Sequence, residues 1–163
     1  MHLQVVDPAE IDYFRQLVAA YWRELMPKAV VLSDPARQER YFHEVFAWSG
    51  ESRLPRWALD GERRVGFVSL SFDRLHQSAT IDDFYILPGE RRKGYGTQVV
   101  EAVFALLAHT DIEAVELNVR RDNPAALAFW EAQGFRIAHY RLRQYRDPHS
   151  GERLIGALSS DFA

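Results

Sequence analysis

The chain has 163 residues and is 47% hydrophobic, and this length and composition predict one compact domain, residues 1–163, with a single core. A formal charge of -3 argues against a protein built mainly to bind nucleic acid, and the lack of cysteine excludes disulfides, thiolate zinc sites and a cysteine nucleophile. The first residues show no basic segment followed by an apolar one, and no apolar run approaches the roughly 20 residues that span a bilayer. We therefore expect a cytoplasmic protein with neither a nucleic-acid nor a membrane partner.

The N-terminal third of the sequence predicts a short strand followed by two helices. The strand covers residues 3–6. The Asp-Pro pairs at positions 7–8 and 34–35 suit the cap and the first position of two helices. Apolar residues then recur at steps of three and four as far as about Leu25, which is typical of a helix with one buried face.

From residue 53 onward, alternating apolar patterns predict strands that are interrupted by two further helices. The predicted order is β-α-α-β-β-β-α-β-α-β-β, a mixed α/β domain with one sheet and helices on its faces. The expected elements are a hairpin of strands 57–59 and 65–72 turning at Asp60-Gly61, a strand 79–87 closed by Pro88-Gly89, a helix from Gly94 to Leu107 with a wide apolar face (Val99, Val100, Val103, Phe104, Leu106, Leu107), a strand 115–119, a helix from Asn123-Pro124 to Gln133, and a closing hairpin of residues 135–145 and 153–159.

The segment between strand 79–87 and the next helix has the composition of an anion-binding loop. The first turn of a helix offers backbone N–H groups without partners and a partial positive charge, and Gly94 and Gly96 let an anion approach. Thr97 adds a hydroxyl donor. Residues 91–93 are Arg-Arg-Lys, and cations before a helix cost about 0.3–1 kcal/mol each unless an anion lies among them. Alternatively, the glycines only form a tight turn and the cations are a solvated surface run.

The spacing of the glycines narrows the class of anion. The loop does not match G-x-x-x-x-G-K-[ST], so a nucleoside triphosphatase is disfavoured. It also lacks the third glycine of G-x-G-x-x-G, because position 99 is Val, and the next strand runs into Arg120-Arg121 where a dinucleotide-binding fold needs an acidic residue.

Two sequence blocks resemble a known family. Arg91-Arg92-Lys93-Gly94-Tyr95-Gly96 fits the (Q/R)-x-x-G-x-(G/A) signature of the GCN5-related N-acetyltransferase (GNAT) superfamily. Residues 81–88 look like its fourth strand, and residues 123–135 are similar to its block N-x-x-A-x-x-(F/L)-Y-x-x-x-G-F. The resemblance covers roughly residues 53–140 and implies the acyl-CoA N-acyltransferase fold.

The resemblance implies acetyl-CoA as cosubstrate. In this family the strand before the loop diverges from the next strand, the pantetheine arm pairs with its backbone, and the loop amides hold the pyrophosphate. Asn123 would contact the cofactor arm, although an Asn before a Pro is also an ideal helix cap. The residues expected to bind the coenzyme are Phe84, Tyr85, Ile86, Leu87, Arg91, Arg92, Lys93, Gly94, Tyr95, Gly96, Thr97, Asn123 and Trp130.

The implied reaction is acetyl transfer from acetyl-CoA to a primary amine by direct attack in a ternary complex, with a backbone N–H near Ile86 stabilising the thioester oxygen. Trp130 stands where many members carry a tyrosine acid, and an indole cannot release its proton near neutral pH. We expect Asp83 to act as the base. Either water protonates the departing thiolate, or another tyrosine replaces the acid (Tyr85, on the same strand face as Asp83, or Tyr140), or catalysis is poor. A β-bulge would reverse that parity, and Asp83 on a solvated face is the alternative. A non-catalytic acyl-CoA-binding or sensor module is the alternative function.

The acceptor amine belongs to a small molecule or a peptide, and the sequence does not choose between them. The histidines show no metal-ligand spacing, so we expect no metal, and a homodimer is compatible with the sequence. Tyr21 and Trp22 fit a core stripe as well as an acceptor wall. The expected walls are Tyr21, Trp22, Glu24 and Met26 on one side and Tyr140, Arg141, Arg143 and Tyr145 on the other.

Overall fold

The computed structural model describes residues 1–25, 35–45 and 54–140 of the chain. These residues fall into two compact units, which divide after Asn118 and are described one after the other. No helix within the described ranges is long and apolar enough to cross a membrane.

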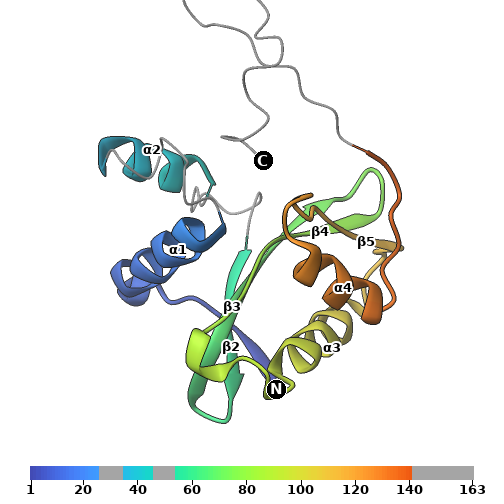
Figure 1. The fold of residues 1–163 in the computed structure, drawn as a ribbon, viewed down its shortest axis with the longest axis horizontal. Coiled ribbons are helices and arrows are strands. Elements are labelled where there is room, and N and C mark those ends of the chain that lie inside the picture. Colours follow the sequence, from blue (N-terminus) through green and yellow to red (C-terminus); the bar gives the residue numbers. More distant parts are fainter. Residues whose placement is uncertain (26–34, 46–53, 141–163) are drawn as a thin grey trace, which may run out of the picture. The chain divides into compact units, whose positions relative to one another are not determined.

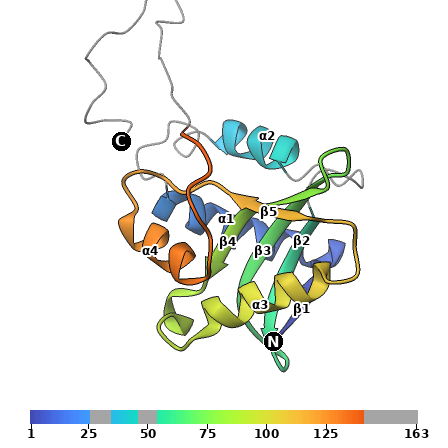
Figure 2. The same ribbon diagram turned by 90° about the vertical axis from the view of Figure 1, so that its right-hand side faces the viewer.

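The first unit contains a five-stranded sheet with its strands in the order β1-β2-β3-β4-β5 (Figures 1 and 2). β1 to β4 are antiparallel to one another, and β5 is parallel to β4. The mixed sheet confirms the predicted α/β class. The strands are β1 (His2–Val5), β2 (Leu54–Asp60), β3 (Arg63–Asp73), β4 (Ser78–Ile86) and β5 (Ala114–Leu117).

Three α-helices cover the two faces of this sheet, with α1 and α2 on one face and α3 on the other (Figures 1 and 2). Short 3-10 turns precede α1 and follow β4. The helices are α1 (Ile11–Leu25), α2 (Pro35–Val45) and α3 (Tyr95–Leu107), and the 3-10 turns are η1 (Pro8–Glu10) and η3 (Pro88–Glu90).

Local chemistry sets the boundaries of these elements. The side chain of Asp7 accepts a hydrogen bond from the N–H of Ala9 at 2.7 Å, which confirms the predicted cap. Gly61 turns the β2–β3 hairpin with a φ of +62°, and Gly94 caps α3 with a φ of +81°. Both conformations are left-handed, which favours glycine at both positions.

The core under α1 and α2 is aromatic. Phe14 of α1 packs edge-on against Trp57 of β2 and Phe67 of β3, with ring centroids 5.4 Å and 5.2 Å apart. Trp57 is 1% exposed, and its indole N–H donates to Glu10 at 2.9 Å, so burial leaves no polar atom of the ring unsatisfied. This packing holds α1 on β2 and β3, beside β4.

The face under α3 is narrower than predicted. Val99, Val103 and Leu107 are buried, at steps of four residues. Phe104 and Leu106 are 47% and 38% exposed, so the expected wide apolar face is wrong at these two positions. A helix buries only the stripe that meets the sheet, and these side chains lie beside it.

The second unit contains α4 (Pro124–Ala132), preceded by its cap Asn123 and ended by Gly134 at a φ of +93°, as predicted. Through α4 the described elements follow the predicted order. Residues 135–140 form no strand with any described residue, but their predicted partner strand is not among those residues, so the closing hairpin stays a prediction. The rest of that closing hairpin lies outside the described residues.

Candidate functional site

The C-terminal half of β4 has one open edge. The pairing of β4 with β5 ends at Ile81, which lies opposite Leu117. On its other edge β4 stays paired with β3 as far as Ile86, opposite Gly66. Beyond Ile81, no strand in the described part of the chain pairs with the β5 side of β4. Residues 82–86 therefore present backbone groups at an unpaired edge (Figure 2).

The hydrogen bonds of β4 decide which residues face that edge. The N–H of Leu87 donates to the carbonyl of Val65 at 2.9 Å and so points toward β3. Successive residues of a strand direct their backbone groups to opposite edges. The backbone N–H and C=O groups of Tyr85 therefore also point toward β3, whereas those of Phe84 and Ile86 point toward the open edge.

A β-bulge lies just before Asp83. Ser69 of β3 is opposite Asp83, but the next pair is Leu70 with Ile81, which leaves Asp82 as an extra residue. Residues in register share a face of the sheet. Ile81 and Asp83, two positions apart, therefore lie on opposite faces.

The side chain of Asp83 points into the α1 side of the sheet. Its pairing with Ser69, and that of Tyr85 with Phe67, places Asp83 and Tyr85 on one face, as expected. Asp83 is 5% exposed and accepts a hydrogen bond from the Ser69 hydroxyl, so the alternative of a solvated carboxylate is wrong.

Tyr85, Glu24 and Arg91 form a polar cluster next to it. The Arg91 guanidinium donates to both carboxylate oxygens of Glu24, at 2.7 Å and 2.8 Å, and lies 5.3 Å from the centroid of the Tyr85 ring. The Tyr85 hydroxyl donates to Glu24 at 3.5 Å. The hydrogen bond from Arg91 lowers the pKa of Glu24. Burial, with the charge of Glu24, raises the pKa of Tyr85. At neutral pH the cluster holds an ionised carboxylate and a protonated phenol.

The loop after η3 offers free backbone donors. No described residue accepts a hydrogen bond from the backbone N–H groups of residues 92–97, whereas the N–H of Arg91 donates to a carbonyl of η3 at 3.4 Å. Gly94 turns the chain into α3, and Gly96 and Thr97 lie in the first helical turn. Six consecutive free amides at a helix N-terminus suit an anion with several oxygens.

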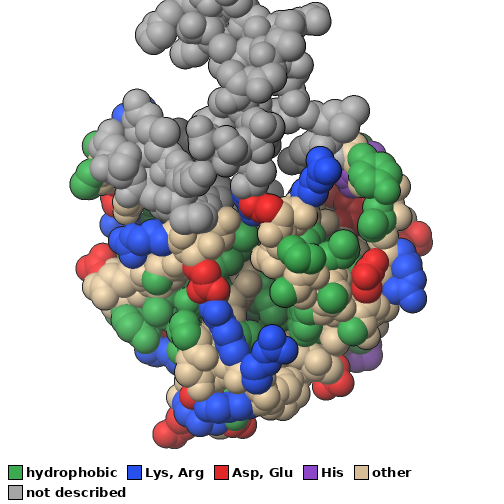
Figure 3. Space-filling model, in the orientation of Figure 1, with side chains coloured by type: hydrophobic (Ala, Val, Ile, Leu, Met, Phe, Trp, Pro, Cys, Tyr) green, Lys and Arg blue, Asp and Glu red, His purple; other side chains and the backbone are tan. Residues whose placement is uncertain are grey.

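Two of the three cations before α3 have carboxylate partners, which sequence reasoning missed. Arg91 pairs with Glu24, and Lys93 pairs with Glu90 at 3.1 Å. Arg92 makes no ion pair with any residue that the structure describes, and its φ is +61°. Figure 3 shows Lys and Arg side chains gathered where this loop lies in Figure 1. The amides are thus a stronger reason for an anion than the charges are.

Tyr95 fastens the start of α3 to the β2–β3 hairpin. Its hydroxyl donates to Asp60 at 2.7 Å and accepts from Arg63. Arg63 also lies 3.6 Å from a carboxylate oxygen of Glu90. The side chain of Tyr95 is therefore a structural anchor, and only its backbone belongs to the loop.

Gly66 belongs to the site and was missed from the sequence. An added Cβ at this position would lie 2.0 Å from the carbonyl oxygen of Tyr85 and 3.1 Å from the Cα of Ile86. Because Gly66 has no side chain, β3 can approach β4 closely along the edge of β4 that lies opposite the open one. A glycine inside a strand pattern is the signal that marks such an approach.

In the second unit, both sequence candidates have structural roles. The side chain of Asn123 accepts a hydrogen bond from the N–H of Ala126 at 3.0 Å, so the cap interpretation is confirmed. Trp130 is 7% exposed and packs edge-on against Phe129 and Phe135, at centroid distances of 5.0 Å and 5.2 Å. Trp130 therefore belongs to the packed interior of this unit.

The expected acceptor wall is described only in part. Trp22 is 4% exposed and belongs to the core. Tyr21 packs on Tyr85 with ring centroids 5.4 Å apart, and Tyr140 is 83% exposed. Met26, Arg141, Arg143 and Tyr145 lie outside the described residues.

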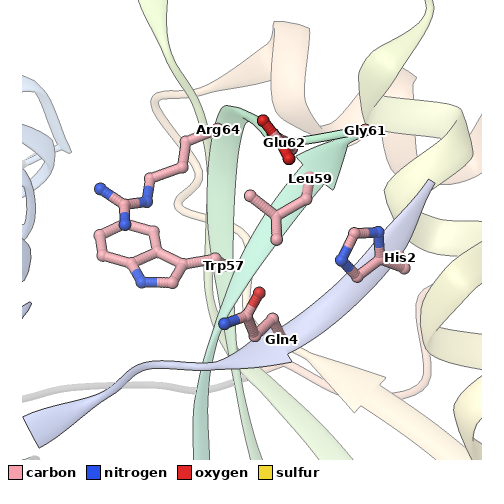
Figure 4. A pocket seen from close by; sticks show the side chains of 7 residues that line it. All are labelled: His2, Gln4, Trp57, Leu59, Gly61, Glu62 and Arg64. Carbon is pink, nitrogen blue, oxygen red and sulfur yellow. The ribbon is translucent and has the colours of Figure 1, made fainter.

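A cavity of about 260 Å³ lies on the β1 side of the sheet, away from the polar cluster of Glu24, Tyr85 and Arg91 (Figure 4). His2 and Gln4 of β1, Trp57 and Leu59 of β2 and Arg64 of β3 contribute to its lining. The described residues contain no group of three side chains that suits a metal ion.

Comparisons with known proteins agree with this architecture. A model of the acetyltransferase (GNAT) family matches residues 13–135. N-alpha-acetyltransferase 30 of Schizosaccharomyces pombe is 28% identical over 118 residues, which cover 70% of this chain and 75% of that protein.

The YycN protein of Bacillus subtilis has a similar structure, with a TM-score of 0.73, 18% identity and coverage of 88% of this chain and 96% of that one. The PaiA N-acetyltransferase of Thermoplasma acidophilum, solved in complex with coenzyme A, gives a TM-score of 0.66 at 14% identity, covering 86% and 92%. The two structures show the shared fold, and the family match shows that this chain belongs to the acetyltransferase (GNAT) family and is an acetyl-CoA-dependent acetyltransferase.

Proposed function

We propose that the protein is an N-acetyltransferase that moves the acetyl group of acetyl-CoA to a primary amine of a peptide or small molecule, by direct attack in a ternary complex. One observation carries the proposal: the open edge of β4 ends at Ile86, and the free amides begin at Arg92, a few residues later. One continuous stretch of backbone can therefore hold both an extended arm and a diphosphate.

The coenzyme fits these groups chemically. The amides of residues 92–97 and the N-terminus of α3 favour a diphosphate, and Gly94 keeps side-chain atoms away from it. The outward N–H and C=O groups of Phe84 match an amide of a pantetheine arm, which would add to the sheet as an extra strand does, while the C=O of Ile86 already accepts a hydrogen bond from Arg91. On the motif alone, Asn123 and Trp130 are proposed as further contacts.

Acetyl-CoA supplies an activated acetyl thioester. We assign to the buried carboxylate of Asp83 the acceptance of a proton from the amine, because the amine must be neutral to attack. The N–H of Ile86 is assigned to the oxygen on which negative charge develops. Tyr85 stays protonated because burial and Glu24 raise its pKa, so it suits the acid that protonates the departing thiolate.

Glu24 and Tyr21 favour a cationic acceptor. Glu24, next to last in α1, has a half-exposed carboxylate that attracts an ammonium group, and the Tyr21 ring offers an aromatic face beside Tyr85. The similarity to an N-alpha-acetyltransferase favours a peptide N-terminus among the possible amines.

The test is coenzyme release, followed with a thiol reagent, over a panel of amines. The panel holds peptides with a free N-terminus, the same peptides blocked at the α-amine but carrying lysine, and small polyamines. A ternary complex gives intersecting initial-rate lines, and mass spectrometry locates the acetyl group on nitrogen.

The variants Asp83→Asn and Tyr85→Phe are expected to lower kcat by about 10²-fold or more, the usual contribution of a general acid or base. Parallel initial-rate lines would contradict direct attack. If the coenzyme binds but no amine raises turnover above spontaneous hydrolysis, the proposed transfer is wrong and a coenzyme-binding module takes its place.

A further inference from the structure

We infer that Arg91, the first residue of the loop motif, is a positioning residue that ties the C-terminal turn of α1 to the end of β4, and that its side chain does not bind the coenzyme anion. The inference rests on the proposed function, since it divides the roles of the loop between coenzyme and acceptor.

All three nitrogens of the Arg91 guanidinium already have protein partners. Nε donates to the carbonyl of Ile86 at 2.9 Å, and the two terminal nitrogens donate to the two oxygens of Glu24 at 2.7 Å and 2.8 Å. This is the bidentate geometry that arginine forms with a carboxylate, and a lysine cannot reproduce it. Turning the group toward an anion would break three hydrogen bonds together.

The contacts join parts of the chain that are distant in sequence. Glu24 and Arg91 are 67 positions apart, and Ile86 is the last residue of β4. The guanidinium also lies over the Tyr85 ring, at 5.3 Å from its centroid. One side chain therefore fixes the carboxylate proposed for the amine, the phenol proposed as acid, and the carbonyl at the open edge.

Arg92 is the matched residue for comparison. It lies next in the loop, at the start of the free amides, and it forms no ion pair with the described residues. Arg92 and Arg91 have the same side chain in adjacent positions, but only Arg91 is held by other groups. The geometry thus leaves Arg92 as the cation available to the anion.

The two roles differ in their effect on proton binding. Among the described residues, the charged groups that face the Tyr85 hydroxyl are Glu24 from α1 and Arg91 from the loop, while the neighbouring Tyr21 and Phe67 are uncharged. Arg91 lowers the pKa of Glu24, and Glu24 raises that of Tyr85. Arg91→Gln should therefore raise the pKa of Glu24, and Glu24→Gln should lower the pKa of Tyr85.

The experiment compares Arg91→Gln, Arg92→Gln and Glu24→Gln in the full chain. Calorimetry with coenzyme A should show an affinity within about twofold of the parent for Arg91→Gln, but about tenfold weaker for Arg92→Gln, the loss of one charge-assisted contact. Carbon-13 NMR titration of the Glu24 carboxyl should show its pKa raised only in Arg91→Gln. With an accepted amine, Arg91→Gln and Glu24→Gln should raise its KM, and the double variant should be no worse than either.

Equal losses of coenzyme affinity in the two arginine variants, or an unchanged titration of Glu24, would overturn the inference. If Arg91→Gln does not fold, Arg91→Lys replaces it, because it keeps the charge without the bidentate contact. Affinity and titration need no acceptor, so a failure of the proposed transfer can be told apart from a failure of this role.

Discussion

Gly66 of β3 lies opposite Ile86 of β4, and a side chain cannot be added there without moving β4. In the variant Gly66→Ala the new Cβ would lie 2.0 Å from the carbonyl oxygen of Tyr85 and 3.0 Å from its carbonyl carbon. A Cβ is essentially never found closer than 3.0 Å to another heavy atom, so the strands must separate by at least about 1.0 Å. Both contacts are with backbone, which cannot rotate away as a side chain would.

The displacement predicts two effects of different size. Overpacking of this kind costs about 1–3 kcal/mol, which lowers Tm by roughly 2–12 °C in a chain of this length. The displaced residues carry the groups assigned to acid catalysis and to the thioester oxygen. Misplacing reacting groups by about 1 Å costs on the order of 10²-fold, so kcat/KM should fall by about that factor.

Thermal unfolding and coenzyme release measure these two effects. The matched control is Gly89→Ala, since a Cβ at Gly89 meets no atom within 4 Å, and its Tm should change by no more than about 1–2 °C. If Gly66→Ala keeps the Tm and the kcat/KM of the parent, β3 and β4 are not as close as described, and the role given to Gly66 is wrong.

Three more outcomes follow from single observations. In hydrogen exchange, the amides of Phe84 and Ile86 should exchange quickly in the free protein and slowly with acetyl-CoA bound, whereas the protection of the Tyr85 amide between them should not change. Protection of all three amides in the free protein would contradict an open edge. In urea unfolding, Asn123→Ala should lower the free energy of unfolding by about 1 kcal/mol because the helix cap is lost, and Asn123→Ser should restore this stability. If the serine variant still binds the coenzyme weakly, Asn123 has a ligand role as well. Arg91 lowers the pKa of Glu24 from its ordinary 4.5, so their pairing stabilises the protein above that pH, and this stability is lost as the pH falls below it. Both groups are partly exposed, so the free energy of unfolding of the parent and of Glu24→Gln should differ by at most about 1 kcal/mol. At acidic pH this difference should be absent.

The sequence predicted the elements whose signals are local. Asp7 caps its helix, Gly61 turns its hairpin and Gly94 starts α3 through contacts within a few residues, so a short stretch of sequence contains the whole cause. The anion-binding loop was predictable for the same reason. Its free amides follow from the start of a helix, which glycine spacing reveals.

Features that depend on distant partners were not predictable. Arg91 was taken as an uncompensated cation, but its partner Glu24 lies 67 positions earlier, and no spacing rule reveals it. The bulge that directs Asp83 depends on how β4 aligns with β3, and only the alternation after it could be predicted. Gly66 gains its role from the approach of another strand.

An unpaired strand edge exposes donors and acceptors that invite pairing with other chains, and proteins usually cover or interrupt such edges. In β4 the opposite arrangement is maintained by independent contacts: β5 stops at Leu117, Gly66 draws β3 close on the other side, and Arg91 is bonded to the carbonyl of Ile86. Each of these fixes the position of β4 without covering the amides of Phe84 and Ile86. An edge that is held in place while no strand of the described residues pairs with it suits a ligand that completes it, and this is why the open edge, more than the charges of the loop, supports coenzyme binding at this place.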